Sequence, residues 1–366
     1  MKCVINKTDA TDDFADPTFS VAVIDWQKQH GRHALPWQNT RDAYRIWLSE
    51  IMLQQTQVTA VIPYYQKFLQ RFPTVESLAA AASEAVMSYW SGLGYYTRAR
   101  NLHRCAQRVV QEYGGHFPDD PALLADLPGI GRSTAAAIAA FAYGRHAAIL
   151  DGNVKRVFAR VFGVEGFPGT KQVEDMLWRR AVALLPLADM AAYTQGLMDL
   201  GAILCVRGKP ACDRCPLASR CVAFATNRTA ELPARKPKKA IPEKETVMLL
   251  ISEGEQVLLQ QRPDSGIWGG LLSLPELPVS RNAEEFGLAV ARATASFGTI
   301  AVCRSLQAFS HVFTHFRLYV SPYQVVLKQR LLQVAESAYV WYPIAELPDA
   351  PLPAPVKKLL LGVYKP

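Results

Sequence analysis

The sequence lacks any long apolar run that is free of charge. None of its 366 residues falls in an uncharged stretch approaching the roughly 20 residues that a membrane-spanning helix needs. Even the segment from Leu184 to Leu204 is interrupted by Asp189 and Asp199. The amino terminus, MKCVINKTDATDDFADPTF, carries acids where a secretory signal requires an apolar core. These absences exclude a membrane protein and predict a cytoplasmic one.

Cysteine is scarce as well, and its distribution is uneven. Only 7 cysteines are present, and Cys3, Cys105 and Cys303 are scattered along the chain. The other four lie in one short segment: Cys205, Cys212, Cys215 and Cys221. Clustered thiols in a chain without an export signal indicate metal ligation rather than disulfides.

Neither charge nor composition is extreme. The 40 Lys and Arg residues exceed the 32 Asp and Glu residues by eight, and 50% of residues are hydrophobic. This composition is that of a folded globular protein, and its positive excess favours a polyanionic partner. The length exceeds what a single core usually fills, so the sequence predicts more than one domain.

The apolar spacing divides the chain into two parts. Residues 1–225 show helical spacing, as at Val75–Met87, Ala135–Tyr143 and Val173–Leu185, and residues 246–366 form a predicted α+β domain. The expected strands are Thr246–Ile251, Gln256–Gln260 (a hairpin with the first), Thr299–Leu306, Thr314–Val326 and Tyr339–Trp341, and the expected helices are Ala283–Ala295 and Pro355–Val363. The polar, basic, proline-punctuated residues 226–245 read as a solvated linker rather than as a dedicated DNA contact.

The cysteine segment, residues 205–221, has the spacing Cys-x6-Cys-x2-Cys-x5-Cys. Four thiolates in a compact loop suit either a tetrahedral zinc ion or a [4Fe–4S] cluster, and the spacing alone leaves both open. Arg207 and Lys209 project positive charge from this loop, which suits either a phosphate contact or plain exposure to solvent.

A glycine hairpin and an aspartate follow one another at a specific spacing. Gly129 and Gly131 lie between two helical segments, where glycines allow close approach of a partner and a following helix N-terminus can bind phosphate. Asp151 precedes a helix over Asn153–Phe162, and helix capping alone would account for it. Together, however, hairpin, alanine-rich helix and aspartate resemble the helix–hairpin–helix DNA glycosylase superfamily, and the cysteine loop resembles its iron–sulfur variant.

Glu50 lies in the segment Tyr44–Val58, and helical spacing surrounds it with Ile46, Trp47, Leu53 and Gln54. A surface glutamate is the plain alternative, but these neighbours include no Lys or Arg. A desolvated, unpaired carboxyl has a raised pKa and is a candidate general acid.

Longer stretches resemble one family within the superfamily, the adenine DNA glycosylase (MutY) family. They are residues 44–58, Leu35-Pro36-Trp37, Gly92-Leu93-Gly94-Tyr95-Tyr96, residues 149–156 and Met198-Asp199-Leu200-Gly201-Ala202. The resemblance is nearly continuous from Trp26 to Phe224. It implies an all-α core with a [4Fe–4S] cluster on the four cysteines, and removal of adenine opposite 8-oxoguanine or guanine in double-stranded DNA.

The resemblance also implies roles for individual residues. Glu50 protonates N7 of an extruded adenine, and Asp151 stabilises the sugar cation. Substrate contacts fall to Trp37, Leu53, Gln195 and Ser133, while a pocket contact from Gln38 is in doubt because some relatives have arginine there. DNA contacts fall to Gln55, Tyr95, Gly129 and Gly131. Ser133 stands where endonuclease III carries a lysine nucleophile, so base release without strand cleavage is expected.

The carboxy-terminal part resembles the Nudix fold. Gly270 and Glu276 match the start of the Nudix hydrolase motif, but Leu288 and Ala289 replace its metal-binding glutamates. Without these oxygen ligands the domain is expected to read 8-oxoguanine rather than to hydrolyse nucleotides. The resemblance assigns this reading to a loop made of Phe309, Ser310 and His311.

Two other functions are compatible with parts of this pattern. One is an endonuclease III-like glycosylase and lyase acting on oxidised pyrimidines, which Ser133 and the carboxy-terminal domain oppose. The other is a non-catalytic iron–sulfur DNA sensor, which the intact Glu50 and Asp151 oppose. We expect a bacterial, nucleoid-associated monomer; no docking motif for a protein partner is recognisable.

Overall fold

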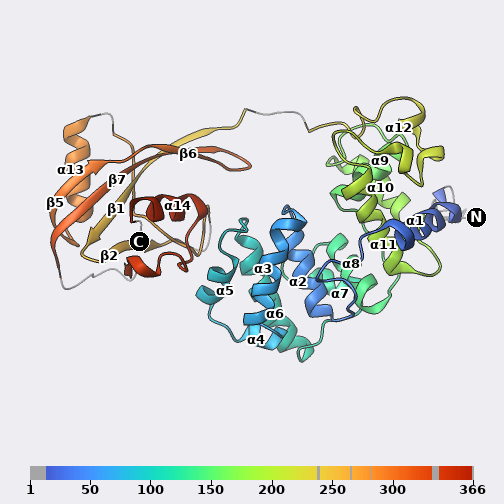
Figure 1. Ribbon diagram of the computed structural model, residues 1–366, viewed down its shortest axis with the longest axis horizontal. Helices are drawn as coiled ribbons and strands as arrows, with labels where there is room; N and C mark the ends of the chain where they lie inside the picture. Colours follow the sequence, from blue (N-terminus) through green and yellow to red (C-terminus); the bar gives the residue numbers. More distant parts are fainter. Residues whose placement is uncertain (1–13, 237–239, 264–265, 281, 332–337, 365–366) are drawn as a thin grey trace, which may run out of the picture. The chain divides into compact units, whose positions relative to one another are not determined.

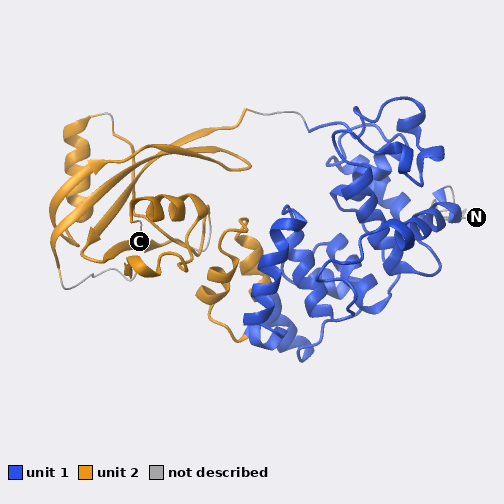
Figure 2. Ribbon diagram, viewed as in Figure 1, with its two compact units in different colours: residues 1–79, 104–238 blue, residues 80–103, 239–366 orange. Residues whose placement is uncertain are grey.

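The computed structural model describes residues 14–236, 240–263, 266–280, 282–331 and 338–364. Its contacts divide the chain into two compact units, shown in Figure 2. Unit 1 comprises residues 1–79 and 104–238, and unit 2 comprises residues 80–103 and 239–366. None of the helices in the described ranges is both long enough and apolar enough to cross a membrane.

Helices dominate the chain up to residue 225 (Figure 1). They are α1 Pro17–His30, α2 Ala43–Leu53, α3 Val58–Arg71, α4 Val75–Ala79, α5 Ser83–Trp90, α6 Thr97–Tyr113, α7 Pro121–Asp126, α8 Arg132–Tyr143, α9 Gly152–Val161, α10 Lys171–Ala183, α11 Met190–Asp199 and α12 Val222–Ala225. A π-helical turn, η2 Leu200–Leu204, continues α11, and the short 3-10 turns η3 Cys212–Arg214 and η4 Ala218–Arg220 lie in the cysteine loop.

The core of unit 1 forms where α1, α8, α9, α10 and α11 pack together. Phe19 and Phe158 are fully buried there, and their rings meet edge to face with centroids 5.9 Å apart. The alanines of α8 let neighbouring helices approach closely, and Gly144 ends this helix in the left-handed conformation at φ +66°. This packing fixes the two ends that matter for the site, the start of α8 and the start of α9.

Unit 2 contains a mixed sheet. Its strands are β1 Glu243–Glu253, β2 Gln256–Gln261, β3 Leu272–Ser273, β4 Glu276–Leu277, β5 Gly298–Ser305, β6 Phe309–Val312, β7 Arg317–Arg330 and β8 Tyr339–Pro343. The principal order is β3-β2-β1-β7-β5; β4 pairs with β1, β6 with β7 and β8 with β2. The long strands β1 and β7 run parallel, from Glu243 opposite Arg317 to Ser252 opposite Val326. Helix α13 Ala283–Thr294 packs its Val290 on the sheet, η5 Ile344–Glu346 follows β8, and α14 Ala354–Val363 ends the described chain.

The sequence predicted the fold class, the hairpin of β1 and β2, and most helices correctly. One expected continuous helical segment is wrong, because Val75–Met87 is broken into α4 and α5. Helix α2, which carries Glu50, ends at Leu53, and Gln55 just beyond it has a left-handed backbone at φ +58°, which a helix cannot contain.

Further expectations are corrected in the strands and the linker. The expected strand Thr314–Val326 begins three residues later than predicted, because β7 starts at Arg317. Phe309, Ser310 and His311, expected as a loop, instead form the strand β6. Residues 226–245 are not a free tether throughout. Leu232 is buried, and its carbonyl accepts a hydrogen bond from Arg160 Nε at 2.9 Å, so this part of the segment packs on unit 1.

Candidate active site

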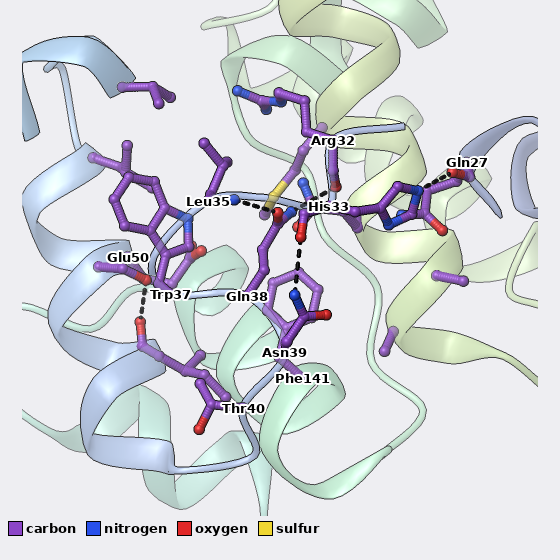
Figure 3. A pocket seen from close by; sticks show the side chains of 18 of the residues that line it. Gln27, Arg32, His33, Leu35, Trp37, Gln38, Asn39, Thr40, Glu50 and Phe141 are labelled. Atoms are coloured by element: carbon purple, nitrogen blue, oxygen red, sulfur yellow. Dashed lines mark hydrogen bonds between the residues drawn. The ribbon is translucent and has the colours of Figure 1, made fainter. Parts of the chain in front are cut away.

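A cavity of about 450 Å³ opens in unit 1 between α2, α11 and the loop of residues 31–41 (Figure 3). Four residues predicted to act on the substrate line it: Trp37, Glu50, Leu53 and Gln195. The size is that of a small-molecule pocket, and the walls combine apolar side chains with a few polar groups. The cavity can therefore enclose a flat heterocycle the size of a nucleobase.

Glu50 is the acidic side chain that lines this cavity. Its position on α2 surrounds it with the buried Ile46 and Trp47. Burial, the larger cause, and the nearby charge of Asp151 together raise its pKa to about 8. At neutral pH Glu50 therefore holds a proton that it can donate, and the two carboxyl groups lie close enough to influence one another.

Asp151 caps α9. Its Oδ1 accepts hydrogen bonds from the backbone N–H groups of Asn153 at 3.0 Å and Val154 at 2.8 Å, and Oδ2 accepts one from Asn153 Nδ2 at 3.2 Å. Burial raises the pKa of Asp151, while these donors and the charge of Arg156 act in the opposite direction. The carboxylate is thus fixed in orientation, and it lies beside the cavity rather than among the described residues that line it.

The start of α8 holds the segment in front of Asp151. Ser133 Oγ accepts a hydrogen bond from the backbone N–H of Leu150 at 2.9 Å. Ser133 does not appear among the described residues that line the cavity. Before it, the hairpin carries Gly129 with a left-handed backbone at φ +80°, and both Gly129 and Gly131 are exposed. The hairpin therefore offers bare backbone to a partner.

Sequence reasoning missed a buried ion pair behind the cavity. The Asp199 side chain is fully buried and pairs with Arg32 at 2.7 Å, and it also accepts from the Arg32 backbone N–H at 2.8 Å. Asp199 Oδ1 additionally accepts a hydrogen bond from Gln195 Nε2 at 2.8 Å. Asp199 thus fixes Gln195 and the loop at residue 32 together; its place one residue after Met198 in a family motif was the available signal.

Gln38, whose pocket contact was in doubt, lines the cavity. Its Oε1 accepts from the Leu35 N–H at 3.0 Å and its Nε2 donates to the Arg32 carbonyl at 2.9 Å (Figure 3). The oxygen and the nitrogen of the Gln38 side-chain amide are thus both hydrogen-bonded to the backbone of this loop. The side chain therefore serves to hold the loop that carries Trp37.

Gln55 of unit 1 and Tyr95 of unit 2 share an unusual backbone state. Each is exposed, and each has a positive φ, +58° for Gln55 and +49° for Tyr95. Such conformations cost energy in non-glycine residues and concentrate at functional sites. The finding is compatible with the DNA contacts that the resemblance implies for each residue.

The four clustered cysteines line one small cavity beside α9: Cys205, Cys212, Cys215 and Cys221. Burial, the largest cause, and the charges of the other three thiols together raise the pKa of Cys215 to about 11, so the four thiols lie within electrostatic range of one another. Arg160 donates to Cys205 Sγ at 3.3 Å and to the Val206 carbonyl at 2.7 Å. Across the described ranges, no group of three or more His, Cys, Asp or Glu side chains is placed to hold a metal ion.

In unit 2 the predicted reading residues form β6 and pair with β7, Ser310 opposite Tyr319 and His311 opposite Leu318. The His311 ring lies against Trp268, with centroids 6.0 Å apart, and against Phe313 at 4.7 Å. Ser310 is exposed. An aromatic cluster therefore supports His311 on one face of this hairpin, and Ser310, the preceding residue of the strand, is exposed on the other face.

The structure, like the sequence, lacks the carboxylates of α13 that a Nudix hydrolase uses to bind metal. Glu276 is paired with the Arg262 guanidinium rather than standing free. On α13, Leu288 and Ala289 occupy the positions at which the motif requires carboxylates, and Leu288 is exposed.

Two family models match the chain. One, described as HhH-GPD superfamily base excision DNA repair protein, matches residues 48–181, and the other, NUDIX domain, matches residues 246–362. They match the helical core and the sheet-containing part, respectively.

Relatives match nearly the whole chain. A Buchnera aphidicola (subspecies Acyrthosiphon pisum) protein named adenine DNA glycosylase is 36% identical over 352 residues, covering 95% of this chain and 98% of the relative. The Mus musculus adenine DNA glycosylase is 32% identical over 403 residues, covering 95% of this chain and 78% of the relative. A solved thermostable thymine-DNA glycosylase is 30% identical with a TM-score of 0.53, covering 60% of this chain and 100% of that one.

Proposed function

The chain belongs to the adenine DNA glycosylase family, and from this premise we propose that it hydrolyses the N-glycosidic bond of adenine mispaired with 8-oxoguanine or guanine in double-stranded DNA. The observation that carries the proposal is Glu50, a carboxyl group in the cavity wall whose pKa is raised to about 8 while a second carboxyl lies near it. A protonated acid next to a fixed carboxylate is the pair that glycoside hydrolysis requires.

In this mechanism the adenine leaves the base stack and enters the cavity, because the glycosidic bond is inaccessible inside a duplex. Trp37 and Leu53 provide apolar walls, and Gln195, held by Asp199, offers an amide to the base edge. Glu50 donates its proton to N7 of adenine, which makes the base a better leaving group.

Asp151 stabilises the positive charge that develops on the sugar as the bond breaks. Burial disfavours its anion, but a cation formed beside it reverses this preference through direct attraction. Its three N–H donors fix the carboxylate before the reaction begins. After base loss, Glu50 accepts the proton of the attacking water.

Strand cleavage is not part of the proposed activity. A glycosylase that also cleaves the strand uses an amine nucleophile, and the position implied by the resemblance holds Ser133. Its hydroxyl oxygen is used as an acceptor for the Leu150 N–H. Ser133 therefore positions the segment that leads to Asp151.

DNA is proposed to contact exposed backbone and strained residues. Gly129 and Gly131 present the hairpin to a phosphate, and Gln55 and Tyr95 present side chains that can enter the base stack. The exposed Ser310, which precedes His311 in β6, is proposed to hydrogen-bond 8-oxoguanine.

The cysteine loop is proposed to hold a [4Fe–4S] cluster. Such a cluster takes one thiolate per iron, and the four thiols that line one cavity supply this number of ligands. Cys205, Cys212, Cys215 and Cys221 would be the ligands, and the cluster would supply a rigid crosslink for the loop. Arg160 holds the loop from α9 by its contacts to Cys205 and Val206.

The test is single-turnover base release from duplexes containing A·8-oxoguanine, A·G or thymine glycol. We expect adenine release, fastest opposite 8-oxoguanine, with no strand break before alkali treatment. Glu50→Gln and Asp151→Asn should bind the mismatch and lose at least about a hundredfold in rate, whereas the exposed Glu84→Gln should be unaffected. Release of thymine glycol with borohydride trapping would refute the proposal in favour of a glycosylase and lyase.

A further inference from the structure

A second large cavity in unit 1, of about 610 Å³, is lined by an exceptional number of cations. Its walls come from the start of α9, residues 167–169, the cysteine loop and residues 230–236. Six basic residues line it: Lys155, Arg156, Arg160, Arg207, Arg235 and Lys236. Of the described residues that line it, none is Asp or Glu.

Three of these basic side chains already have partners within the protein. Lys155 Nζ pairs with Glu174 at 2.7 Å. Arg156 donates to the Cys205 carbonyl at 2.7 Å and the Gly201 carbonyl at 2.6 Å. Arg160, which is 2% exposed, donates to the carbonyls of Leu232 and Val206. These residues build the cavity.

The other three basic side chains have no ion-pair partner among the residues that the structure describes. Arg207, Arg235 and Lys236 are exposed, and none of them forms an ion pair with any carboxylate in the ranges that the structure describes. Three like charges facing one cavity repel each other, which favours occupation by an anion.

The segment that carries two of them is anchored. Leu232 is buried, its carbonyl accepts from Arg160 Nε at 2.9 Å, and Arg228 pairs with Glu165 at 2.8 Å and with Glu231 at 3.0 Å. Arg235 and Lys236 follow this anchor by a few residues. Their charges are therefore held at the cavity instead of being spread over a mobile tether.

We propose that this cavity binds a backbone phosphate of the DNA, and that residues 230–236 are part of the DNA-binding surface. This inference rests on the proposed function. Gly152 lines the cavity and directly follows Asp151, so the phosphate belongs to the strand close to the extruded nucleotide. Guanidinium forks and an ammonium group are the donors that grip phosphate oxygens.

The test is equilibrium binding of the holoenzyme to an A·8-oxoguanine duplex whose adenine nucleoside has a non-hydrolysable glycosidic bond, measured over a range of salt concentrations. Arg235→Ala/Lys236→Ala should weaken binding about tenfold at moderate salt and reduce the slope of log K against log salt by about 1. Arg207→Ala should add to this loss.

Two control variants isolate the cavity. Arg179→Ala/Lys328→Ala removes the same charge from exposed positions outside the cavity and should change the slope by much less. Arg235→Lys/Lys236→Arg keeps the charge and should restore the wild-type slope. Ethylation of single phosphates should reveal one position near the adenine that weakens wild-type binding but not that of Arg235→Ala/Lys236→Ala.

The outcomes separate this inference from the proposed function. Adenine release by the wild type with an Arg235→Ala/Lys236→Ala slope equal to that of the control would overturn the phosphate site alone. Absence of adenine release by the wild type would overturn the proposed function. Competition by millimolar inorganic phosphate, with no difference between variants in the ethylation pattern, would identify a free-anion site and also overturn the inference.

Discussion

At the scale of single residues, the two carboxyl groups of the site differ in what surrounds them. Glu50 has apolar neighbours and the charge of Asp151 nearby, and these raise its pKa to about 8. Asp151 is only partly exposed as well, but three N–H donors hold it. The environment therefore assigns a proton to Glu50 and a fixed orientation to Asp151, which is how two chemically similar groups acquire different roles.

The raised pKa of Glu50 predicts the pH dependence of both activity and stability. Adenine release should decline as pH rises through about 8, because the acid loses its proton. Glu50 is ionised in the unfolded chain above its ordinary pKa but protonated in the folded chain up to about 8. Its contribution to folding stability is therefore present at low pH and lost between these two values, by about 5 kcal/mol for a shift of this size.

Glu50→Gln removes this titration. Chemical denaturation at several pH values should show a smaller decline for the variant than for the wild type between pH 5 and pH 8, roughly the window that Glu50 spans. Equal declines in both proteins would show that Glu50 is ionised in the folded state, and the role of proton donor would then fail with it.

Asp199 contributes to stability through its bonds to Arg32 and Gln195. Asp199→Ala leaves the partly buried Arg32 and the amide of Gln195 without their acceptor, so the free energy of unfolding should fall by about 3–5 kcal/mol. The control is Asp119→Ala, which breaks a half-exposed pair with Arg145 and should cost about 0–1 kcal/mol. Urea denaturation of both variants measures the difference; equal losses would contradict a special role for Asp199.

At the scale of elements, helix caps and apolar spacing predicted the helices whose bounds depend on neighbouring residues in the sequence. Two signals depend only on residues close together in the sequence: the helix cap at Asp151 and the apolar spacing of α8, α9 and α10. These helices were therefore predicted to within a few residues. The break between α4 and α5 was missed because alanine-rich spacing continues across residues 80–82. Apolar periodicity does not record where tertiary packing ends a helix.

The candidate site was predictable for a different reason. Trp37, Glu50, Leu53 and Gln195 were named from the family resemblance, and the fold brings all four to one cavity. The buried pair of Arg32 and Asp199 was not named, because a contact across 167 residues leaves no local pattern in the sequence. Cation-lined cavities built from four separate segments are hidden for the same reason.

The hairpin of β6 and β7 carries the next prediction. Ser310→Ala removes an exposed hydroxyl from β6, so the preference for A·8-oxoguanine over A·G should fall about fivefold or more, the value of one hydrogen bond. The matched control is Ser305→Ala, at the exposed end of β5. The ratio of single-turnover rates on the two duplexes measures the preference, and a ratio unchanged in Ser310→Ala would remove β6 from recognition.

At the scale of the whole molecule, composition and contacts divide the chain differently. Composition placed the division at residues 226–245, whereas the contacts also assign residues 80–103, from the helical part of the sequence, to unit 2. Ser88 Oγ donates to the Asp349 carbonyl at 2.8 Å, Ser91 Oγ donates to the Leu352 carbonyl at 3.0 Å, and Arg100 donates to the Gly269 carbonyl. These bonds join segments about 260 residues apart in the first two cases, beyond the reach of any sequence pattern.

This division predicts the result of removing residues 241–366. The shortened chain loses the acceptors of Ser88, Ser91 and Arg100, so α5 should open more readily, while α8 and α9 keep their packing in the core of unit 1. Hydrogen exchange followed by mass spectrometry should show faster exchange over residues 83–90 and unchanged protection over residues 152–161. Equal protection of residues 83–90 in both chains would mean that α5 is held by the helical part alone, and loss of protection in α9 as well would mean that the core of unit 1 depends on the residues removed.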